Sequence, residues 1–287
     1  MGGSPSSIIR AKRVKNRFIM STITLLTDFG SEDAYVGVMK GVILSVNSSA
    51  KIIDISHAVD PQDLVEAAYL IQSCYRYFPE HTVHIVVVDP GVGSDRAIVA
   101  LEMMGHVFLA PNNGVLTLLV DEGEIDAMVR VENTHYFLNP ISQTFHGRDI
   151  FAPVGAHVSM GIDINSLGSP LDPQDLVSLD IPKPRISNGD ELIGTFVSID
   201  RFGNCISNID GDDLKKFAGN DDEKGFEIKT GKNIIAGLSQ RYADVEPESP
   251  LAIFGSFGYL ELALNCGNAS RRLKIKKGDA ITLKLKK

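Results

Sequence analysis

The sequence predicts an α/β N-terminal domain with a largely parallel sheet, followed by a smaller all-β C-terminal domain. Residues 22–170 alternate short apolar runs with helical patterns, as βαβ units do. Residues 171–187 are rich in proline, which favours an extended linker. Residues 188–287 contain short apolar runs separated by turn residues, a pattern typical of a β-sandwich or barrel.

Five apolar runs predict the strands of the first domain. Most lack polar–apolar alternation, which suits strands buried on both faces of a parallel sheet. They cover residues 23–27, 51–55, 83–88, 97–103 and 106–110. We expect helices over residues 35–46 and 60–78. The second of these begins with Asp60 as its N-cap and Pro61 at its first helical position.

The second domain is predicted to consist of short strands. These are expected within residues 191–200, 233–238, 251–257, 259–265 and 279–286. The tract 210–225, DGDDLKKFAGNDDEKG, is highly charged, and we expect it to form a solvated loop.

Bulk composition excludes several classes of protein. The chain has 287 residues and 44% hydrophobic residues, and its longest apolar runs are far shorter than the roughly 20 residues that span a bilayer. A net charge of −8 argues against nucleic acid or an anionic membrane as a partner. Cys74, Cys205 and Cys266 are far apart and form no CxxC, so we expect reduced, buried thiols in a cytoplasmic protein.

Residues 1–21 differ from the rest of the chain. They carry five basic residues and no acidic one. Three interpretations stay open: a transit peptide, a leader added for expression, or a native extension ahead of a start at Met20. We expect this segment to be disordered or artificial and dispensable for folding.

The segment HIVVVDPGVGSDR, residues 84–96, is the most informative in the chain. A buried strand ends in Asp89, a tight Pro-Gly turn follows, and Arg96 comes just after it. In open α/β sheets ligands bind beyond the carboxyl ends of such strands, so Asp89 is a candidate functional residue. The structural alternative is that Asp89 only caps the turn.

Two further segments carry polar residues in similar positions. A predicted strand ends in Asp28, and TFHGRDIFAP, residues 144–153, brings His146, Arg148 and Asp149 into four residues. The bland interpretation is that Arg148 and Asp149 form a buried ion pair and that His146 is structural.

Other known motifs fit poorly. DFG at 28–30 and HGRD at 146–149 stand in the reverse of the protein-kinase order, and the glycines of DPGVGSDR do not form GxGxxG. A metal site formed by Asp28, Asp89, His146 and Asp149 is conceivable, but the histidines show no HxH or HxxxH spacing. We therefore expect no metal.

Taken together, six motifs resemble one family, the S-adenosylmethionine hydroxide adenosyltransferases, which are related to fluorinating and chlorinating enzymes. The motifs are ITLLTDFGSEDAYVG (23–37), DPGVG (89–93), APNNG (110–114), TFHGRDIFAP (144–153), IDRFGN (199–204) and GSFGYLELALN (255–265). The resemblance implies hydrolysis of S-adenosylmethionine to adenosine and L-methionine without a cofactor. It also implies a homotrimer whose active site lies at a subunit interface, between the N-terminal domain of one subunit and the C-terminal domain of the next.

The chemistry of this substrate needs a nucleophile more than an acid. Methionine leaves a sulfonium readily, whereas making hydroxide from water at pH 7 costs about 12 kcal/mol. A positive charge and a base beside the water lower that cost. By resemblance, Asp89, Arg96 and His146 form the catalytic group. Arg96 would stabilise the hydroxide, and Asp89 with His146 would orient the water and accept its proton.

The resemblance also assigns substrate-binding positions. Asp28 suits the ribose hydroxyls, Asn113 the ribose, and Asp200 the amino group. Phe202 and Asn204 would hold the adenine, and Ser256 the methionine carboxylate. Phe29 and Glu261 complete the predicted set. The alternative is that the FGN and GSFG segments are merely β-turns.

Two rival functions stay open. One is a non-catalytic binding module for adenosine or S-adenosylmethionine, which would not need the catalytic group. The other is a halide-using adenosyltransferase. Halogenating relatives carry Tyr at the position of Asp89, Ser at that of Gly147, and an inserted loop that this chain lacks after Arg96. Asp89 would repel a halide, which favours hydrolysis. The chain also lacks an extra residue between Asp200 and Phe202, which leaves the adenine contacts less defined.

Overall fold

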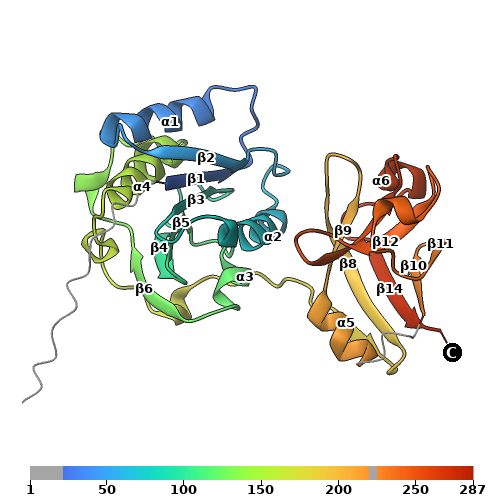
Figure 1. Ribbon diagram of the computed structural model, residues 1–287. Coiled ribbons are helices and arrows are strands. Elements are labelled where there is room, and N and C mark those ends of the chain that lie inside the picture. The colour runs from blue at the N-terminus through green and yellow to red at the C-terminus, as the bar shows by residue number, and fades with distance from the viewer. Residues whose placement is uncertain (1–21, 220–224, 287) are drawn as a thin grey trace, which may run out of the picture.

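A computed structural model of the protein describes residues 22–219 and 225–286 (Figure 1). The predicted leader therefore lies outside the described residues. Two sheets organise the chain, one in each half. No helix among the described residues has the length and apolar character needed to cross a bilayer.

The first sheet has six strands in the order β2-β1-β3-β5-β4-β6. These are β1 (Thr22–Thr27), β2 (Lys51–Ser56), β3 (Val83–Val87), β4 (Ile98–Met103), β5 (His106–Pro111) and β6 (Ile125–Arg130). The strands β2, β1, β3 and β5 are parallel, but β4 runs antiparallel to both β5 and β6.

The sheet is thus mixed, and the prediction of a largely parallel sheet was wrong in this respect. The cause is the connection between β4 and β5. It consists of Met104 and Gly105, both with positive φ (50° and 76°). Two residues in this conformation form a tight hairpin turn, whereas a parallel pair would need a crossover of a dozen residues.

Helices cover both faces of this sheet (Figure 1). α1 (Tyr35–Val46) and α4 (Ala152–Ser159) pack on one face, and α2 (Leu64–Cys74) with α3 (Thr117–Val120) packs on the other. α2 begins later than predicted. Gln62 has a φ of 67°, which interrupts a helix, and Asp63 rather than Asp60 is the N-cap, accepting a hydrogen bond from Glu66 N at 2.9 Å.

The second sheet is antiparallel throughout, in the order β11-β10-β14-β8-β9-β13-β12, with β7 beside β8. Its strands are β7 (Arg185–Ser187), β8 (Glu191–Ile199), β9 (Cys205–Asp210), β10 (Phe226–Thr230), β11 (Asn233–Ala236), β12 (Pro250–Phe254), β13 (Tyr259–Leu264) and β14 (Ala280–Leu285). The sheet nearly closes into a barrel, since Ser239 N, just past β11, donates to Ala252 O of β12 at 2.8 Å.

Three features of this half differ from prediction. The strands β7, β9 and β10 were missed, and a short helix α6 (Ala269–Leu273) was not expected. The tract predicted as a loop contains α5 (Gly211–Ala218), because the Asp210 side chain caps it and Asp213 completes a capping box. Residues 220–224 of the tract lie outside the described residues.

Of the cysteines, Cys205 is buried, but Cys74 is only partly buried and Cys266 is exposed, so the expectation of buried thiols holds only for Cys205.

The two halves touch through α2, which lies on the side of the first sheet that faces the second domain (Figure 1). Ala68 and Tyr69 of α2 form a small apolar cluster with Ile181 and Val197. The rings of Tyr69 and Tyr259 lie 5.4 Å apart. This contact fixes one face of the first domain against the barrel.

Candidate active site

The order of the parallel strands defines where a site can form. The chain passes from β1 to β2 on one side of β1, and then returns to β3 on its other side. This reversal leaves a crevice at the carboxyl ends of β1 and β3. Thr27 of β1 pairs with Val87 of β3, so Asp28 and Asp89 emerge at the same edge of the sheet. Both carboxylates thus stand at the topological switch point.

The structure brings Asp89, Arg96 and His146 together. Arg96 Nε donates to Asp89 Oδ1 at 2.8 Å and to Oδ2 at 2.9 Å, and Arg96 Nη2 donates to Oδ2 as well. Nη2 also contacts His146 Nδ1 at 3.0 Å. The side chains of Asp89 and Arg96 are only 5% and 10% exposed, so this ion pair is largely removed from bulk water.

Hydrogen bonding defines the tautomer of His146. Arginine has donors but no acceptor, so His146 Nδ1 accepts from Arg96, and a neutral imidazole then carries its hydrogen on Nε2. Burial, and next the positive charge of Arg96, lower the pKa of His146 below its ordinary value. The imidazole therefore stays neutral at pH 7, with one N–H available to donate.

A π-helical turn, Gly147–Phe151, presents His146 at its start and leads into α4. Such turns redirect side chains and are frequent at functional sites. Arg148 donates to Asp149 through Nε at 2.6 Å and through Nη2 at 2.9 Å. The bland interpretation of these two residues as an ion pair is confirmed, but only Asp149 is buried, since the Arg148 side chain is 37% exposed. Ser142 N also donates to Asp149 Oδ2, at 2.8 Å, which anchors the preceding loop.

Gly147 sits in a crowded place. A Cβ there would lie 3.2 Å from Met39 Sδ and 3.2 Å from the ring of Phe145. A serine at this position would thus require its neighbours to shift.

Asp28 and Phe29 follow β1 directly. Asp28 Oδ2 accepts a hydrogen bond from Gln62 N at 2.9 Å, which orients the carboxylate. Phe29 packs partly buried, with its ring 5.7 Å from that of Tyr35 and 6.1 Å from that of Phe145. The structure therefore places Asp28 at the sheet edge and gives Phe29 a largely packing role.

Asn113 lies in the loop after β5. Its Nδ2 donates to Val88 O at 2.9 Å, and its Oδ1 accepts from Val115 N at 3.2 Å. One end of this amide thus binds the backbone next to Asp89, and the other end binds the backbone of its own loop. Asn113 supports the turn that carries Asp89, and its ribose contact stays a prediction.

In the second domain, Asp200 organises the FGN turn. Its Oδ1 accepts from Phe202 N at 2.9 Å and from Asn204 N at 2.8 Å, and its Oδ2 accepts from Asn204 Nδ2 at 2.9 Å. Asn204 is buried, whereas the side chain of Phe202 is 75% exposed. Asp200 and Asn204 therefore stabilise the turn, while Phe202 presents an uncovered ring; the substrate contacts of all three stay predictions.

Glu261 and Ser256 lie on the neighbouring strands and turn. Glu261 is buried and accepts a hydrogen bond from the Tyr242 hydroxyl. Burial raises the pKa of Glu261, and Asp200 raises it further, against the opposing effect of Tyr242. Ser256 is exposed in the turn between β12 and β13. Sequence reasoning missed Tyr242, for which the sequence offers no local signal.

The predicted residues thus form two groups. Asp28, Asp89, Arg96 and His146 gather in the first domain; Asp200, Phe202, Asn204, Ser256 and Glu261 belong to the second. Among the described residues, no hydrogen bond or ion pair joins one group to the other within this chain.

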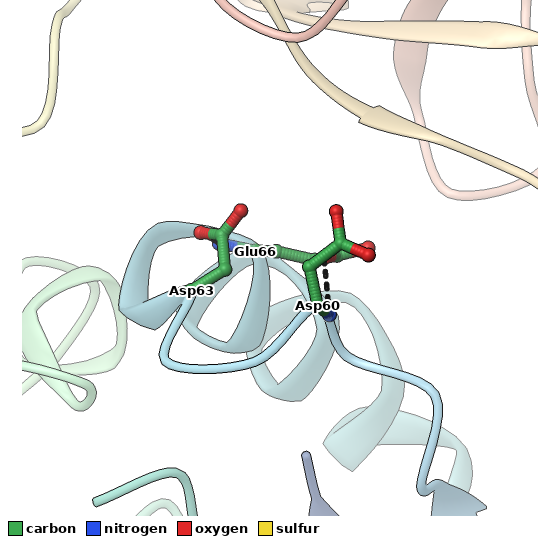
Figure 2. A group of neighbouring side chains, drawn as sticks. All are labelled: Asp60, Asp63 and Glu66. Atoms are coloured by element: carbon green, nitrogen blue, oxygen red, sulfur yellow. Dashed lines mark hydrogen bonds between the residues drawn. The ribbon is translucent and has the colours of Figure 1, made fainter. Parts of the chain in front are cut away.

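A third group, Asp60, Asp63 and Glu66, was not expected as a unit. The three carboxylates cluster at the start of α2, close enough to hold a cation (Figure 2). The cation that they contact is Lys277 of the second domain, whose Nζ lies 2.6, 3.1 and 2.5 Å from Asp60, Asp63 and Glu66. Their i, i+3 spacing is the signal that the sequence carried.

Comparison with known proteins decides the family. The N-terminal domain model of the SAM hydroxide adenosyltransferases matches residues 23–168, and the C-terminal domain model matches residues 194–282. The chain belongs to the SAM hydroxide adenosyltransferase family. The resemblance inferred from the motifs is confirmed.

Named relatives are similar to this chain over nearly their whole length. A protein from Methanocaldococcus jannaschii named (R)-S-adenosyl-L-methionine hydrolase is 34% identical, over 92% of this chain and 96% of that protein. A Thermus thermophilus protein of the same name is also 34% identical, over 92% and 100%. A protein from an Actinoplanes species named fluorinase is 29% identical, over 91% and 96%.

Solved structures agree with the fold. A conserved protein from Thermotoga maritima has a TM-score of 0.85 and 37% identity, covering 91% of this chain and 99% of its own. One from Thermus thermophilus has a TM-score of 0.72 and 31% identity, covering 93% and 100%. The two-domain arrangement is thus shared with other proteins at these identities.

Proposed function

We propose that the protein hydrolyses S-adenosylmethionine to adenosine and L-methionine by in-line attack of an activated water on the ribose C5′. The observation that carries this proposal is the buried Asp89–Arg96–His146 group at the switch point of a family member. The relatives named (R)-S-adenosyl-L-methionine hydrolase, at 30–34% identity over about nine tenths of the chain, support the same reaction.

The reaction balances without a cofactor. The water oxygen forms a bond to C5′, the C5′–sulfur bond breaks, and its electron pair leaves with methionine as a neutral thioether. One proton must leave the water. Arg96 stabilises the negative charge that develops on the oxygen, and His146 Nε2–H donates to that oxygen. Asp89, the only anionic member of the three, takes the proton.

Water is a better nucleophile than halide for this site. Asp89 places a negative charge beside the reacting atom, which would repel a halide ion. A serine at the position of Gly147, as in halogenating relatives, would require Met39 and Phe145 to shift, since a Cβ would meet both at 3.2 Å. The halide-using alternative is therefore the less favoured.

We further propose that the site is completed by a second copy of the chain in a homotrimer. The two groups of predicted residues do not touch within one chain. Side chains that would gain by burial are exposed near both groups: Tyr35 and Val38 on α1, and Phe202 and Phe257 in the turns of the barrel. A neighbouring barrel that covers the switch point would bury both sets and exclude water from the substrate.

The test is chromatography of purified protein incubated with S-adenosylmethionine in ¹⁸O-labelled water with 150 mM chloride. We expect adenosine and methionine in equal amounts, with ¹⁸O in the 5′-hydroxyl. Formation of 5′-chloro-5′-deoxyadenosine would support the halide alternative. Tight binding without any product would support the non-catalytic binding module.

A further inference from the structure

The loop between β2 and α2 holds Asp28 in place. Gly30 N donates to His57 O at 2.8 Å, and Gln62 N donates to Asp28 Oδ2 at 2.9 Å. The loop and the segment after β1 are therefore tied at two points. Among the described residues, the other oxygen of Asp28 accepts no hydrogen bond, so the carboxylate is oriented yet half free.

The same loop is clamped from the other domain. Lys277 Nζ contacts Asp60 and Asp63, the residues that flank the Gln62 turn, and Glu66 in the first turn of α2. Glu66 in turn accepts from Asp60 N at 3.1 Å, drawn as the dashed line in Figure 2, and from Ser198 Oγ of β8 at 3.2 Å. Burial increases along the cluster: the Asp60 side chain is 68% exposed, those of Asp63 and Lys277 are 27% and 25% exposed, and that of Glu66 is only 10% exposed.

Lys277 is itself held rigidly. It lies in the turn before β14, where Gly278 has a φ of 85° and its N–H donates to Phe196 O of β8 at 2.8 Å. Lys276 N donates to Asp279 Oδ2 at 2.8 Å, which closes the turn. A fixed ammonium therefore meets the loop at a defined position.

The Lys277 clamp, formed by the Lys277 ammonium with Asp60, Asp63 and Glu66, depends on the charge of Lys277. Three carboxylates share one cation, so without Lys277 they would repel one another at less than 5 Å. Burial would lower the pKa of Lys277, but hydrogen bonds to Asp60 and Glu66 outweigh it and raise the pKa. The ammonium thus stays charged at neutral pH, and its loss would let the turn around Gln62 spread.

We propose that Lys277 is a positioning residue for Asp28: by clamping residues 60–66 it sets the Gln62 N–H that orients the Asp28 carboxylate for a ribose diol. This inference rests on the proposed function only in taking the ligand to be a nucleoside. It assigns to the barrel of one chain a role in shaping the sheet-edge site of that same chain.

The experiment is a double-mutant cycle with Lys277→Met and Asp28→Ala in the full-length protein. The readouts are adenosine affinity by calorimetry, and KM and kcat for S-adenosylmethionine. We expect Lys277→Met to weaken adenosine binding and to raise KM by about tenfold, with kcat changed by less than about threefold. In the Asp28→Ala background the same substitution should change adenosine affinity by less than about twofold.

Two controls separate positioning from general stability. Lys277→Arg keeps the charge and should recover most of the affinity. Lys284→Met removes a lysine of the same domain that pairs with Glu191 at 3.1 Å and Asp190 at 3.5 Å, away from α2, and should leave affinity unchanged. If Lys277→Met does not fold, the cycle is repeated in the Glu66→Gln background. The double variant Lys277→Met/Glu66→Gln is then compared with Glu66→Gln alone.

The outcomes are distinct. Unchanged adenosine affinity in Lys277→Met, or an equal loss with and without Asp28, would overturn the positioning role while hydrolysis by the wild type stands. Wild type that binds adenosine but releases none from S-adenosylmethionine would overturn the proposed function, while the cycle in adenosine affinity still decides the role of Lys277. Wild type that binds neither compound would overturn both.

Discussion

The two groups of candidate residues differ in what their side chains already contact. In the first domain, Arg96 pairs with Asp89, 7 residues before it, and contacts His146, 50 residues after it, in a buried arrangement. In the second domain, Asp200 uses both oxygens on its own turn, and Phe202 lies 75% exposed beside it. One group is a buried, paired set of side chains, and the other is a hydrogen-bonded turn that leaves an aromatic ring exposed.

This difference suggests a division of labour. Charge that must be desolvated to act has to be paired before the substrate arrives, because an unpaired buried charge is costly. An aromatic surface that recognises a base needs only to be held in shape. We therefore expect substitutions in the first group to act on turnover and substitutions in the second to act on affinity.

The largest effect is expected from Arg96→Met. It removes the cation that we propose stabilises the nascent hydroxide, so kcat should fall by about 10³. Single-turnover release of adenosine measures it. Arg148→Met is the matched control, because Arg148 pairs with Asp149 and not with Asp89. An equal loss in both variants would mean that general destabilisation, not the charge of Arg96, sets the rate.

Next in size is the effect of His146→Ala, which should lower kcat by about 10². His146→Gln should retain more activity than the alanine variant, because a glutamine amide can still donate to the water where Nε2–H does. Rates of the two variants under single-turnover conditions test the tautomer. If glutamine is no better than alanine, His146 is needed as a base and the assigned tautomer is wrong.

A smaller, differently directed effect is expected from Phe202→Ala. Loss of a stacking ring should raise KM by about tenfold while leaving kcat nearly unchanged. The melting temperature should not move, since the ring is exposed. Steady-state kinetics with a thermal melt check both. A fall in kcat with KM unchanged would remove the proposed contrast between the two groups.

The smallest effect is the pH dependence of wild-type turnover. Because burial and Arg96 lower the pKa of His146, its proton is lost at a lower pH than usual, and the neutral form persists below pH 6.5. The acid limb of kcat should therefore lie below pH 6.5, with turnover constant from there to pH 8. An acid limb centred above pH 6.5 would contradict a neutral, Arg96-bound imidazole.

The sequence predicted these regions unequally, for physical reasons. Strands β1 (TITLLT) and β3 (VHIVV) are short, largely apolar runs, so their ends, and with them Asp28 and Asp89, were easy to locate. The sheet is mixed because a two-residue hairpin joins β4 to the antiparallel β5. The prediction missed this because hydrophobic periodicity does not reveal the direction of a strand. Strand β9 was missed because its residues, CISNID, mix polar and apolar types while packing into a nearly closed barrel.

The sequence predicted which residues belong to the candidate site better than it predicted how they contact one another. Motifs pointed to Asp89, Arg96 and His146, but the pairing of Arg96 with both partners depends on how the turn after β3 meets the π-helical turn. The Lys277 clamp was missed for the same reason, because 211 residues separate Lys277 from Glu66. Contacts between distant segments follow from packing, which no local pattern encodes.

The central claim is that Asp89, Arg96 and His146 act as one unit in making the nucleophile. The most direct test is the rate of adenosine release in a single turnover by Asp89→Ala, His146→Ala and the double variant, with adenosine affinity measured by calorimetry. We expect each single variant to be about 10²–10⁴ slower than wild type with little change in affinity, and the double variant to be hardly slower than the slower single variant. A double variant whose loss equals the product of the two single losses, or variants that lose binding but keep turnover at saturation, would contradict it.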